Sequence, residues 1–464
     1  MKGQGMMRVQ GLSRRSFLAN SAMAGFFVAS GTVYGQDAKG EQKLRVLKVG
    51  TGGMGNADTN SLIQHGAIIT GICDVNPNTL GGTAKRFPGA PKFTDYRRML
   101  DKVDPATYDA VCVSTADHTH ATIALNAMRR GKHVYVQKPL AHTYEECEML
   151  IAAADKYRVV TQMGNQGHPG VYRYAKLLEK NFWGNILEVH SWTDRAGGRW
   201  WPQGMRSLPK AAAVPAGYDW DCWLGPAKTR DYSPAYTPFK WRGWCDFGCG
   251  AIGDMAVHNF DPAFFVLKLG LPRTIKAWCD QPAKLAWATY STIDFNFGPS
   301  PVCPKGVNVY WYESGLLPKR PLGSNYRLQV GSNGCMIVGD RATTLGASHA
   351  HKPTCVAAYG HEFGSAETKD MIHSCNDLLK GDGRWSYNHY KEWIDACKAG
   401  KPEDCGSKFA YAAKLTEALL FGCIAQYFPG RELAWDEAKK EFIDNPAATA
   451  LLRGSKRAGF EPFV

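Results

Sequence analysis

The sequence predicts an α/β protein in which an N-terminal Rossmann domain, doubly wound around a parallel sheet, is followed by an α+β domain with a large, mostly antiparallel sheet. Short β-branched runs alternate with helical stretches from Lys43 onward, as in parallel sheets with crossover helices. A glycine-rich turn follows the first of these runs. After Gly164, long runs of alternating polar and apolar residues take over, which is typical of antiparallel strands.

The length of 464 residues suits two domains behind a short leader, given roughly 150 residues or more per domain. We assign residues 36–165 to the Rossmann domain and residues 166–464 to the α+β domain, where we expect substrate binding and oligomer contacts. In the first domain the patterns predict strands over 44–50, 67–73, 108–113, 132–136 and 158–162, and helices over 56–65, 119–130 and 144–156. In the second domain they predict strands over 186–194, 286–297 and 307–313, and helices over 387–398 and 408–428.

Residues 1–35 are predicted to be a twin-arginine signal peptide. Arg14 and Arg15 precede Phe17 and an apolar stretch over 22–33, and no acidic residue occurs before Asp37. Such leaders export folded proteins, so we expect a periplasmic or otherwise exported protein. The alternative is a disordered basic tail on a cytosolic protein.

The composition argues against several kinds of partner. The formal net charge is +13, but the basic residues are scattered among acidic ones without a recognition motif, so nucleic-acid binding is not expected. No run reaches the roughly 18 apolar residues of a membrane span. The 14 cysteines contain no C-x-x-C pair and no Cys/His quartet, so no metal site is expected. Cys397 and Cys405 could form a disulfide after export.

The glycine-rich turn predicts a dinucleotide site. Residues 50–55 read G-T-G-G-M-G and match G-x-G-x-x-G between a predicted strand and a predicted helix. The cofactor-binding residues expected in this turn are Gly50, Gly52, Gly53, Met54 and Gly55. Asp74 ends the next strand, where a carboxylate accepts hydrogen bonds from ribose hydroxyls and repels a 2′-phosphate, so NAD is favoured over NADP. The alternative is a tight turn without a ligand.

Two further segments carry a resemblance to a known family. Gln137-Lys138-Pro139 ends a predicted strand, and residues 248–258 read G-C-G-A-I-G-D-M-A-V-H at the start of a predicted helix. Together with the V-S-T-A-D-H-T-H run at 113–120, they resemble the Gfo/Idh/MocA oxidoreductases, over nearly all of the mature chain. The resemblance implies that Lys138 contacts the substrate hydroxyl and that Asp254 and His258 form a pair whose histidine handles the proton.

The chemistry of these residues agrees with that assignment. Asp254 and His258 are four residues apart, so on one helix they would share a face. Oxidation of a secondary alcohol needs a base for the hydroxyl proton, for which histidine has a suitable pKa, and Lys138 can stabilise the alkoxide. The family commonly has Glu where this chain has Gln137, which removes a negative charge beside Lys138. The alternatives are a surface Lys–Asp pair and a helix-capping aspartate with a satisfied histidine.

Other polar residues extend the candidate cofactor site. We place Thr115, His118, His120, Gln137 and Lys138 in it, with the two histidines near the nicotinamide or behind it rather than on a metal. His168, at the domain junction, is a candidate substrate contact.

A tryptophan-rich segment precedes the Asp254 region. Seven of the 14 tryptophans fall between residues 192 and 244, and indole faces suit the apolar face of a sugar ring. The residues expected to contact substrate there are Asp194, Arg195, Arg199, Trp200 and Trp241. The alternative is that the segment packs on the sheet or forms a subunit interface.

Three hypotheses for the function follow. The first is an NAD-dependent oxidoreductase that takes hydride from a ring CH–OH group of a sugar, glycoside or cyclitol. The second is a redox-neutral enzyme that cleaves or epimerises a glycoside through a transient ketone. An exported protein would meet no pool of NAD, so we expect NAD to be tightly bound, which modestly favours recycling of the hydride. The third is a non-catalytic NAD- or sugar-binding module. In each case we expect a homo-oligomer.

Overall fold

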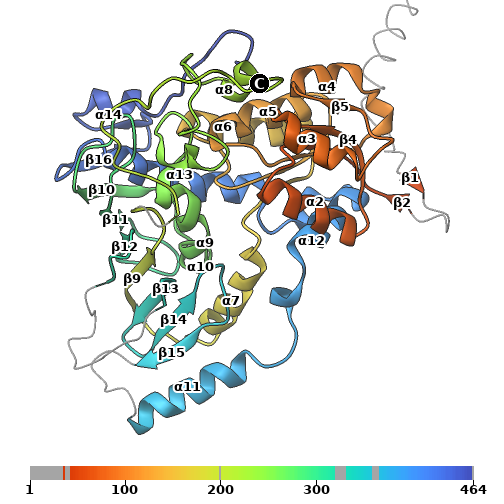
Figure 1. The fold of residues 1–464 in the computed structure, drawn as a ribbon. Coiled ribbons are helices and arrows are strands. Elements are labelled where there is room, and N and C mark those ends of the chain that lie inside the picture. Colours follow the sequence, from red (N-terminus) through yellow and green to blue (C-terminus); the bar gives the residue numbers. More distant parts are fainter. Residues whose placement is uncertain (1–34, 37–41, 198–199, 319–330, 358–364, 462–464) are drawn as a thin grey trace, which may run out of the picture.

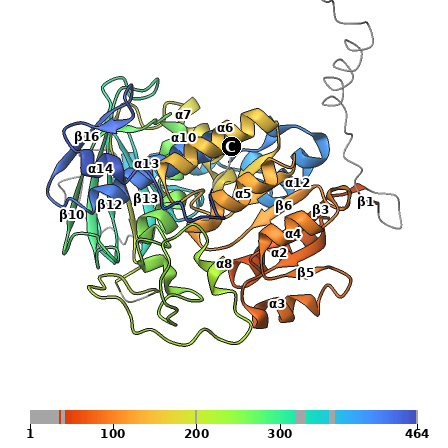
Figure 2. The same ribbon diagram turned by 90° about the horizontal axis from the view of Figure 1, so that it is seen from above.

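The computed structural model describes residues 35–36, 42–197, 200–318, 331–357 and 365–461. These residues form two packed α/β units, which Figures 1 and 2 show from two sides. The predicted signal peptide, apart from its last residue, lies outside the described residues, and so does Arg199. Among the helices described, none is long and apolar enough to cross a membrane.

The first unit is built on a six-stranded sheet in which all neighbouring strands are parallel, which confirms the predicted Rossmann architecture. Its strands, in spatial order, are β5 (Lys92–Phe93), β4 (Ile68–Cys73), β3 (Arg45–Val49), β6 (Ala110–Val113), β7 (His133–Val136) and β8 (Thr161–Met163). The helices that alternate with them are α2 (Met54–Gln64), α3 (Pro77–Ala84), α4 (Tyr96–Lys102), α5 (His120–Met128) and α6 (Tyr144–Tyr157). The central strands are buried along most of their length, so they consist mainly of apolar runs.

The predicted strands of this unit begin within two residues of the observed ones, with one exception. The last strand starts at Thr161 rather than at residue 158. Arg158 closes α6 in a left-handed conformation, with φ of 51°, so the chain is still completing the helix cap where the pattern predicts a strand.

The second unit contains a nine-stranded sheet that is antiparallel except where β9 pairs with β12. This confirms the predicted mostly antiparallel sheet. Its strands, in spatial order, are β15 (Thr354–Ala357), β14 (Thr343–Ala347), β13 (Asn333–Gly339), β9 (Ile186–Thr193), β12 (Val307–Tyr312), β11 (Ser291–Phe297), β10 (Pro272–Cys279), β16 (Glu432–Asp436) and β17 (Glu441–Phe442). The prediction of a strand from residue 286 is wrong for its first five residues, because the Asp280 carboxylate accepts the backbone N–H groups of Thr289 and Tyr290 in a loop.

The remaining helices flank this sheet or join the two units. They are α7 (Val171–Glu179), α8 (Trp220–Leu224), α9 (Val257–Asn259), α10 (Asp261–Val266), α11 (Ala366–Leu378), α13 (Phe409–Ala425) and α14 (Pro446–Ala450). Helix α13 is buried on nearly all sides, because it packs between α6 of the first unit and β10 of the second. One hydrophobic core therefore continues through both units.

Helix α12 (His389–Ala399) comes from the C-terminal half of the sequence but packs on the parallel sheet. Its Trp393 contacts the apolar cluster that contains Leu44 and Val46 of the first unit. Figure 1 shows α12, in blue, beside α2, in red. Residues beyond 165 therefore complete the packing of the first unit. Cys397 and Cys405, considered above for a disulfide, are buried thiols in this cluster.

Candidate functional site

A cavity of about 580 Å³ lies along the carboxyl-terminal edge of the parallel sheet and reaches the second unit. Ligands of open α/β sheets bind at this edge. The predicted site residues that line the cavity are Gly50, Gly52, Gly53, Met54, Asp74, Thr115, Gln137, Lys138, Arg195, Trp241 and Asp254. Gly55, His118, His120, His168, Asp194, Trp200 and His258 do not line it.

The glycine turn after β3 brings the start of α2 to the cavity. Gly50 has φ of 77°, and a Cβ there would overlap the carbonyl oxygen of Ser114. A Cβ on Gly55 would overlap the carbonyl of Gly50. Only glycine fits these two positions, and the close packing sets the N-terminus of α2 beside the cavity, where a pyrophosphate is stabilised.

Asp74 lines the same end of the cavity, directly after β4. Its carboxylate accepts hydrogen bonds from the backbone N–H groups of Thr51, at 2.8 Å, and Asn76, at 2.9 Å. These bonds fix a negative group next to the glycine turn.

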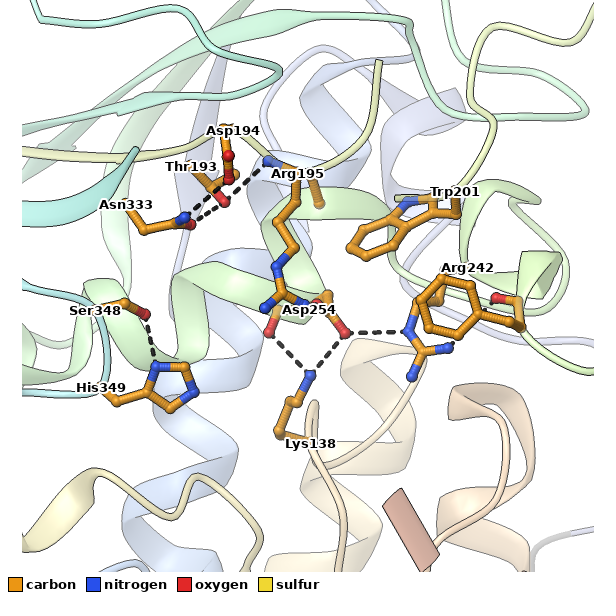
Figure 3. Close-up of polar contacts among 12 residues, drawn as sticks. Lys138, Thr193, Asp194, Arg195, Trp201, Arg242, Asp254, Asn333, Ser348 and His349 are labelled. Carbon is orange, nitrogen blue, oxygen red and sulfur yellow. Dashed lines mark hydrogen bonds and ion pairs between the residues drawn. The ribbon is translucent and has the colours of Figure 1, made fainter. Parts of the chain in front are cut away.

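At the other end of the cavity, three cationic side chains surround Asp254 (Figure 3). Lys138 Nζ donates to Asp254 Oδ1 at 2.6 Å, Arg242 Nε donates to the same oxygen at 3.2 Å, and Arg195 lies 3.6 Å from Oδ2. Burial alone would raise the pKa of Asp254, but Lys138 and Arg242 outweigh burial and hold the pKa well below its ordinary value. Asp254 is therefore a carboxylate throughout the physiological pH range.

The helix that carries Asp254 and His258 is not a continuous α-helix. Asp254 lies in a π-helical turn over Ile252–Ala256, and His258 follows in α9. Such wider turns are frequent at functional sites. Asp254 consequently lines the cavity, whereas His258 lies behind it with an exposed fraction of 3%.

His258 stacks on His349, with ring centroids 3.9 Å apart and planes 22° apart. Burial, followed by the effects of His349 and Lys138, lowers the pKa of His258 well below 6.5. Its Nδ1 is buried and has no hydrogen-bond partner among the described residues. His258 is therefore neutral at pH 7, but the lowered pKa makes it a weaker base than expected from the sequence.

Gln137 contacts a buried carboxylate other than Asp254. Its Nε2 donates to Asp58 Oδ1 at 2.9 Å, and Tyr390 of α12 donates to the same oxygen at 2.7 Å. Ser114 donates to Asp58 Oδ2 and accepts from the buried Lys48, both at 2.5 Å. The negative charge next to Lys138 is supplied by Asp254, so the neutral residue at position 137 does not leave the ammonium unpaired.

The predicted histidines of the 113–120 run have structural contacts. Both ring nitrogens of His118 lie near carbonyl oxygens, of Phe247 and Trp223, and those of His120 near the carbonyls of Pro139 and Thr115. A neutral ring donates to one of its two carbonyls. Burial lowers their pKa values, to about 3 and about 4 respectively. These neutral rings hold the Lys138 segment and the tryptophan-rich segment against α5.

The predicted substrate residues are divided between the cavity and its surroundings. Arg195 and Trp241 line the cavity, while Trp200 is 51% exposed and lies 4.1 Å from the Arg195 guanidinium. Asp194 accepts a hydrogen bond from Asn333. His168 pairs with Asp261 at 2.9 Å in a buried position away from the cavity.

The tryptophan-rich segment mainly packs on itself. Trp220 and Trp223 stack at 4.6 Å, and Trp244 joins Phe247 in the same apolar cluster. Among these residues Trp223, like Trp241, also lines the cavity. The packing alternative thus accounts for most of the segment, and two indoles remain for ligand contact.

Sequence reasoning did not single out Asp117, Arg242 or His349. Asp117 lines the cavity and accepts a hydrogen bond from the backbone of Cys249 at 3.0 Å, and burial raises its pKa to about 7. Its place in the 113–120 run, four residues after the end of β6, could have indicated it. Arg242 lies in the tryptophan-rich segment, which could have indicated it, whereas no feature of the local sequence indicated His349. Within the described part of the chain no group of three His, Cys, Asp or Glu residues could hold a metal ion.

Known proteins resemble this chain at the level of family and fold. Residues 44–165 match the NAD-binding Rossmann fold of the Gfo/Idh/MocA oxidoreductase family, and residues 171–301 match the C-terminal alpha/beta domain of that family. Levoglucosan dehydrogenase of Pseudarthrobacter phenanthrenivorans is 26% identical over 42% of each chain. Inositol 2-dehydrogenase 2 of Saccharopolyspora erythraea is 30% identical over 33% of this chain and 45% of its own.

A solved structure shows the same fold over a longer range. The WlbA dehydrogenase from Bordetella pertussis, in complex with NADH and UDP-GlcNAcA, matches with a TM-score of 0.57 at 18% identity, over 85% of this chain and 99% of its own. The alignments with the two curated relatives span less than half of those relatives. The two family matches together span more than half of the 464 residues, and both fall on the units that form the cavity. The chain belongs to the Gfo/Idh/MocA family of oxidoreductases.

Proposed function

We propose that this protein uses NAD to oxidise a ring CH–OH group of a sugar, glycoside or cyclitol. The observation that carries the proposal is that one cavity holds both the glycine turn of a dinucleotide site and the Lys138–Asp254 pair. The named activities of the two curated relatives, levoglucosan and inositol dehydrogenation, support this substrate class.

The residues present fit NAD. Gly50 and Gly55 let the turn pack tightly against Ser114 and against itself. Gly52 and Gly53 line the cavity without side chains, so the backbone can approach a pyrophosphate there, and Asp74 presents a carboxylate where the ribose hydroxyls would bind. The same carboxylate would repel a 2′-phosphate, which supports NAD over NADP. When bound, NAD would accept the hydride.

The polar groups at the other end of the cavity would bind the substrate hydroxyl and take up its proton. Lys138, held by Asp254, donates to the substrate hydroxyl and stabilises the developing alkoxide. We assign the hydroxyl proton to His258 because the family resemblance implies this role and its ring is neutral at pH 7. His258 does not line the cavity. The proton therefore reaches it either by a relay through Asp254 and Lys138 or after a movement of the His258 side chain.

The predicted leader supports a second candidate, redox-neutral chemistry. An exported enzyme would find no free NAD, so it would need to carry the cofactor and regenerate it in each cycle. Cleavage or epimerisation of a glycoside through a transient ketone meets that requirement. We propose a periplasmic location on the strength of the Arg14–Arg15 leader alone.

The test is to purify the protein without added cofactor, denature a sample and measure the dinucleotide released. The remainder is incubated with levoglucosan, myo-inositol, glucose and methyl glucosides, and products are analysed by mass spectrometry. Loss of two hydrogens from a sugar supports net oxidation, whereas a cleaved or epimerised product without free NADH supports the second candidate. Lys138→Met should abolish either outcome while leaving dinucleotide content unchanged. Conversion of no compound, with no dinucleotide bound even when NAD is added, would contradict both.

A further inference from the structure

We propose that the substrate carries an anionic group, in the simplest case a carboxylate on the sugar, and that Arg195 and Arg242 bind it beside the oxidised carbon. The inference rests on the proposed function and adds to it the charge of the substrate. It is carried by an excess of positive charge at one end of the cavity and by hydrogen-bond donors there that the protein leaves unused.

The charges at this end do not balance. Lys138, Arg195 and Arg242 all converge on one carboxylate, Asp254, at 2.6 to 3.6 Å. The two other carboxyl groups of the cavity lining offset this charge only in part: Asp74 lies at the glycine turn, and Asp117 lies close enough to Arg242 and Lys138 for their charges to act on it. Asp74 is bound at the glycine turn, and Asp117 accepts a backbone N–H group and, with its pKa near 7, is partly protonated at neutral pH. The nicotinamide ring of NAD would add a further positive charge, which a neutral sugar does not offset.

Arg195 has unused donors. Its Nε is buried and has no hydrogen-bond partner among the described residues. Its Nη1 lies 3.6 Å from Asp254 Oδ2, too far for a hydrogen bond, and Oδ2 likewise has no hydrogen-bond partner among the described residues. The Arg195 side chain lines the cavity and is 26% exposed, so its terminal nitrogens can donate to a ligand that supplies acceptors there. The planar fork of arginine donors matches the two oxygens of a carboxylate.

Arg242 is already held in position for such a ligand. It donates to Asp254 through Nε and to the carbonyl oxygen of Phe239 through a terminal nitrogen, at 3.3 Å. Its guanidinium lies 4.2 Å from the Trp241 ring and 4.5 Å from the Phe239 ring. Aromatic walls exclude water and so strengthen attraction to an anion, and the Trp241 face can pack on the sugar ring.

The test measures binding separately from catalysis. NAD-loaded full-length protein is titrated calorimetrically with D-glucuronate, its methyl ester and D-glucose. A charge-assisted arginine contact is worth roughly tenfold or more in affinity, so we expect glucuronate to bind at least that much more tightly than its ester. Glucose 6-phosphate and glucose 6-sulfate show whether the site accepts other anions.

Variants identify the residue responsible. Arg195→Gln should bring the affinities for acid and ester close together, while Arg206→Gln, at an exposed arginine outside the cavity, should leave the ratio unchanged. Equal affinity for acid and ester in the wild-type protein, or binding of neither, would overturn the inference. Oxidation is followed in parallel. If acid and ester are oxidised equally well, the proposed function stands and the anionic substrate is excluded. If the acid binds selectively but is not oxidised, the anion site stands and the proposed oxidation fails for this compound.

Discussion

Replacing Gln137 with glutamate tests how the charges around the buried Asp58 are balanced. The Gln137→Glu variant would restore the family's usual residue but would bring a second carboxyl to Asp58, whose oxygen lies 2.9 Å from Gln137 Nε2. Asp58 is already balanced by Lys48, through Ser114. A second negative charge in this buried network would therefore be unpaired.

The size of the effect follows from two competing free energies. Repulsion between unit charges about 3 Å apart costs about 6 kcal/mol at an effective dielectric constant near 20. Protonating a glutamate of ordinary pKa at pH 7 costs only about 4 kcal/mol. The introduced carboxyl should therefore take up a proton on folding. Its folded-state pKa is raised above the unfolded value, so stability is retained below about pH 4.3 and lost as the pH rises, by about 1.4 kcal/mol per pH unit.

The assay is urea unfolding of the wild-type and variant proteins at several pH values between 4.5 and 7.5. We expect the loss of unfolding free energy in Gln137→Glu to be small at pH 4.5 and about 3 to 4 kcal/mol at pH 7. The double variant Asp58→Asn/Gln137→Glu, which restores a single negative charge, should recover most of the loss. A difference from wild type that does not change with pH would show that the introduced carboxyl does not take up a proton on folding.

Four further predictions concern the site. Gly50→Ala should prevent dinucleotide binding and lower the melting temperature, because the methyl group would meet the backbone of Ser114 after β6, whereas Gly81→Ala, in open space on α3, should do neither; equal effects of the two variants in thermal melts with and without NAD would contradict a role of the glycine turn in NAD binding. His258→Ala should lower turnover by roughly 10² to 10⁴ while leaving NAD binding intact in a fluorescence titration; turnover within a few-fold of wild type would exclude it as the base. Replacing Asp74 with Ser and adding a neighbouring arginine should shift preference toward NADP in competitive binding, and unchanged selectivity would show that Asp74 does not read the ribose. Asp117→Asn should gain stability relative to the wild-type protein as the pH rises from about 4 to 7, because the folded Asp117 carboxyl keeps its proton to about pH 7 and its contribution to wild-type stability is lost over that range; parallel profiles of the two proteins in pH-dependent melts would contradict the raised pKa.

The parallel sheet was predictable because its signals are local. Apolar runs such as 110–113 and the glycine turn at 50–55 report burial and backbone geometry directly from the residue types. The packing of α12 on this sheet was not predictable, because the periodicity of residues 389–399 shows that a helix has an apolar face but not which sheet covers it.

In the site, too, the residues marked by local sequence signals were predictable, whereas those placed by tertiary packing were not. Lys138 and Asp254 were identified from short motifs, and they meet in the structure at 2.6 Å. The position of His258 behind the cavity depends on a π-helical turn, and its contact with His349 joins residues 91 positions apart, neither of which a four-residue spacing reveals. Asp58 as the partner of Gln137 likewise depends on tertiary packing.

In both proposed reactions a hydrogen on a sugar carbon passes to a nicotinamide bound in this cavity. Protein loaded with NAD is mixed with ring-deuterated glucose, glucuronate or myo-inositol, quenched within a few turnovers and denatured, and the recovered dinucleotide is analysed by mass spectrometry. We predict deuterium in the nicotinamide ring for at least one of these compounds, whether the net reaction is oxidation or redox-neutral, and none in the Lys138→Met variant. Conversion of a labelled sugar with no deuterium in the dinucleotide would contradict the account.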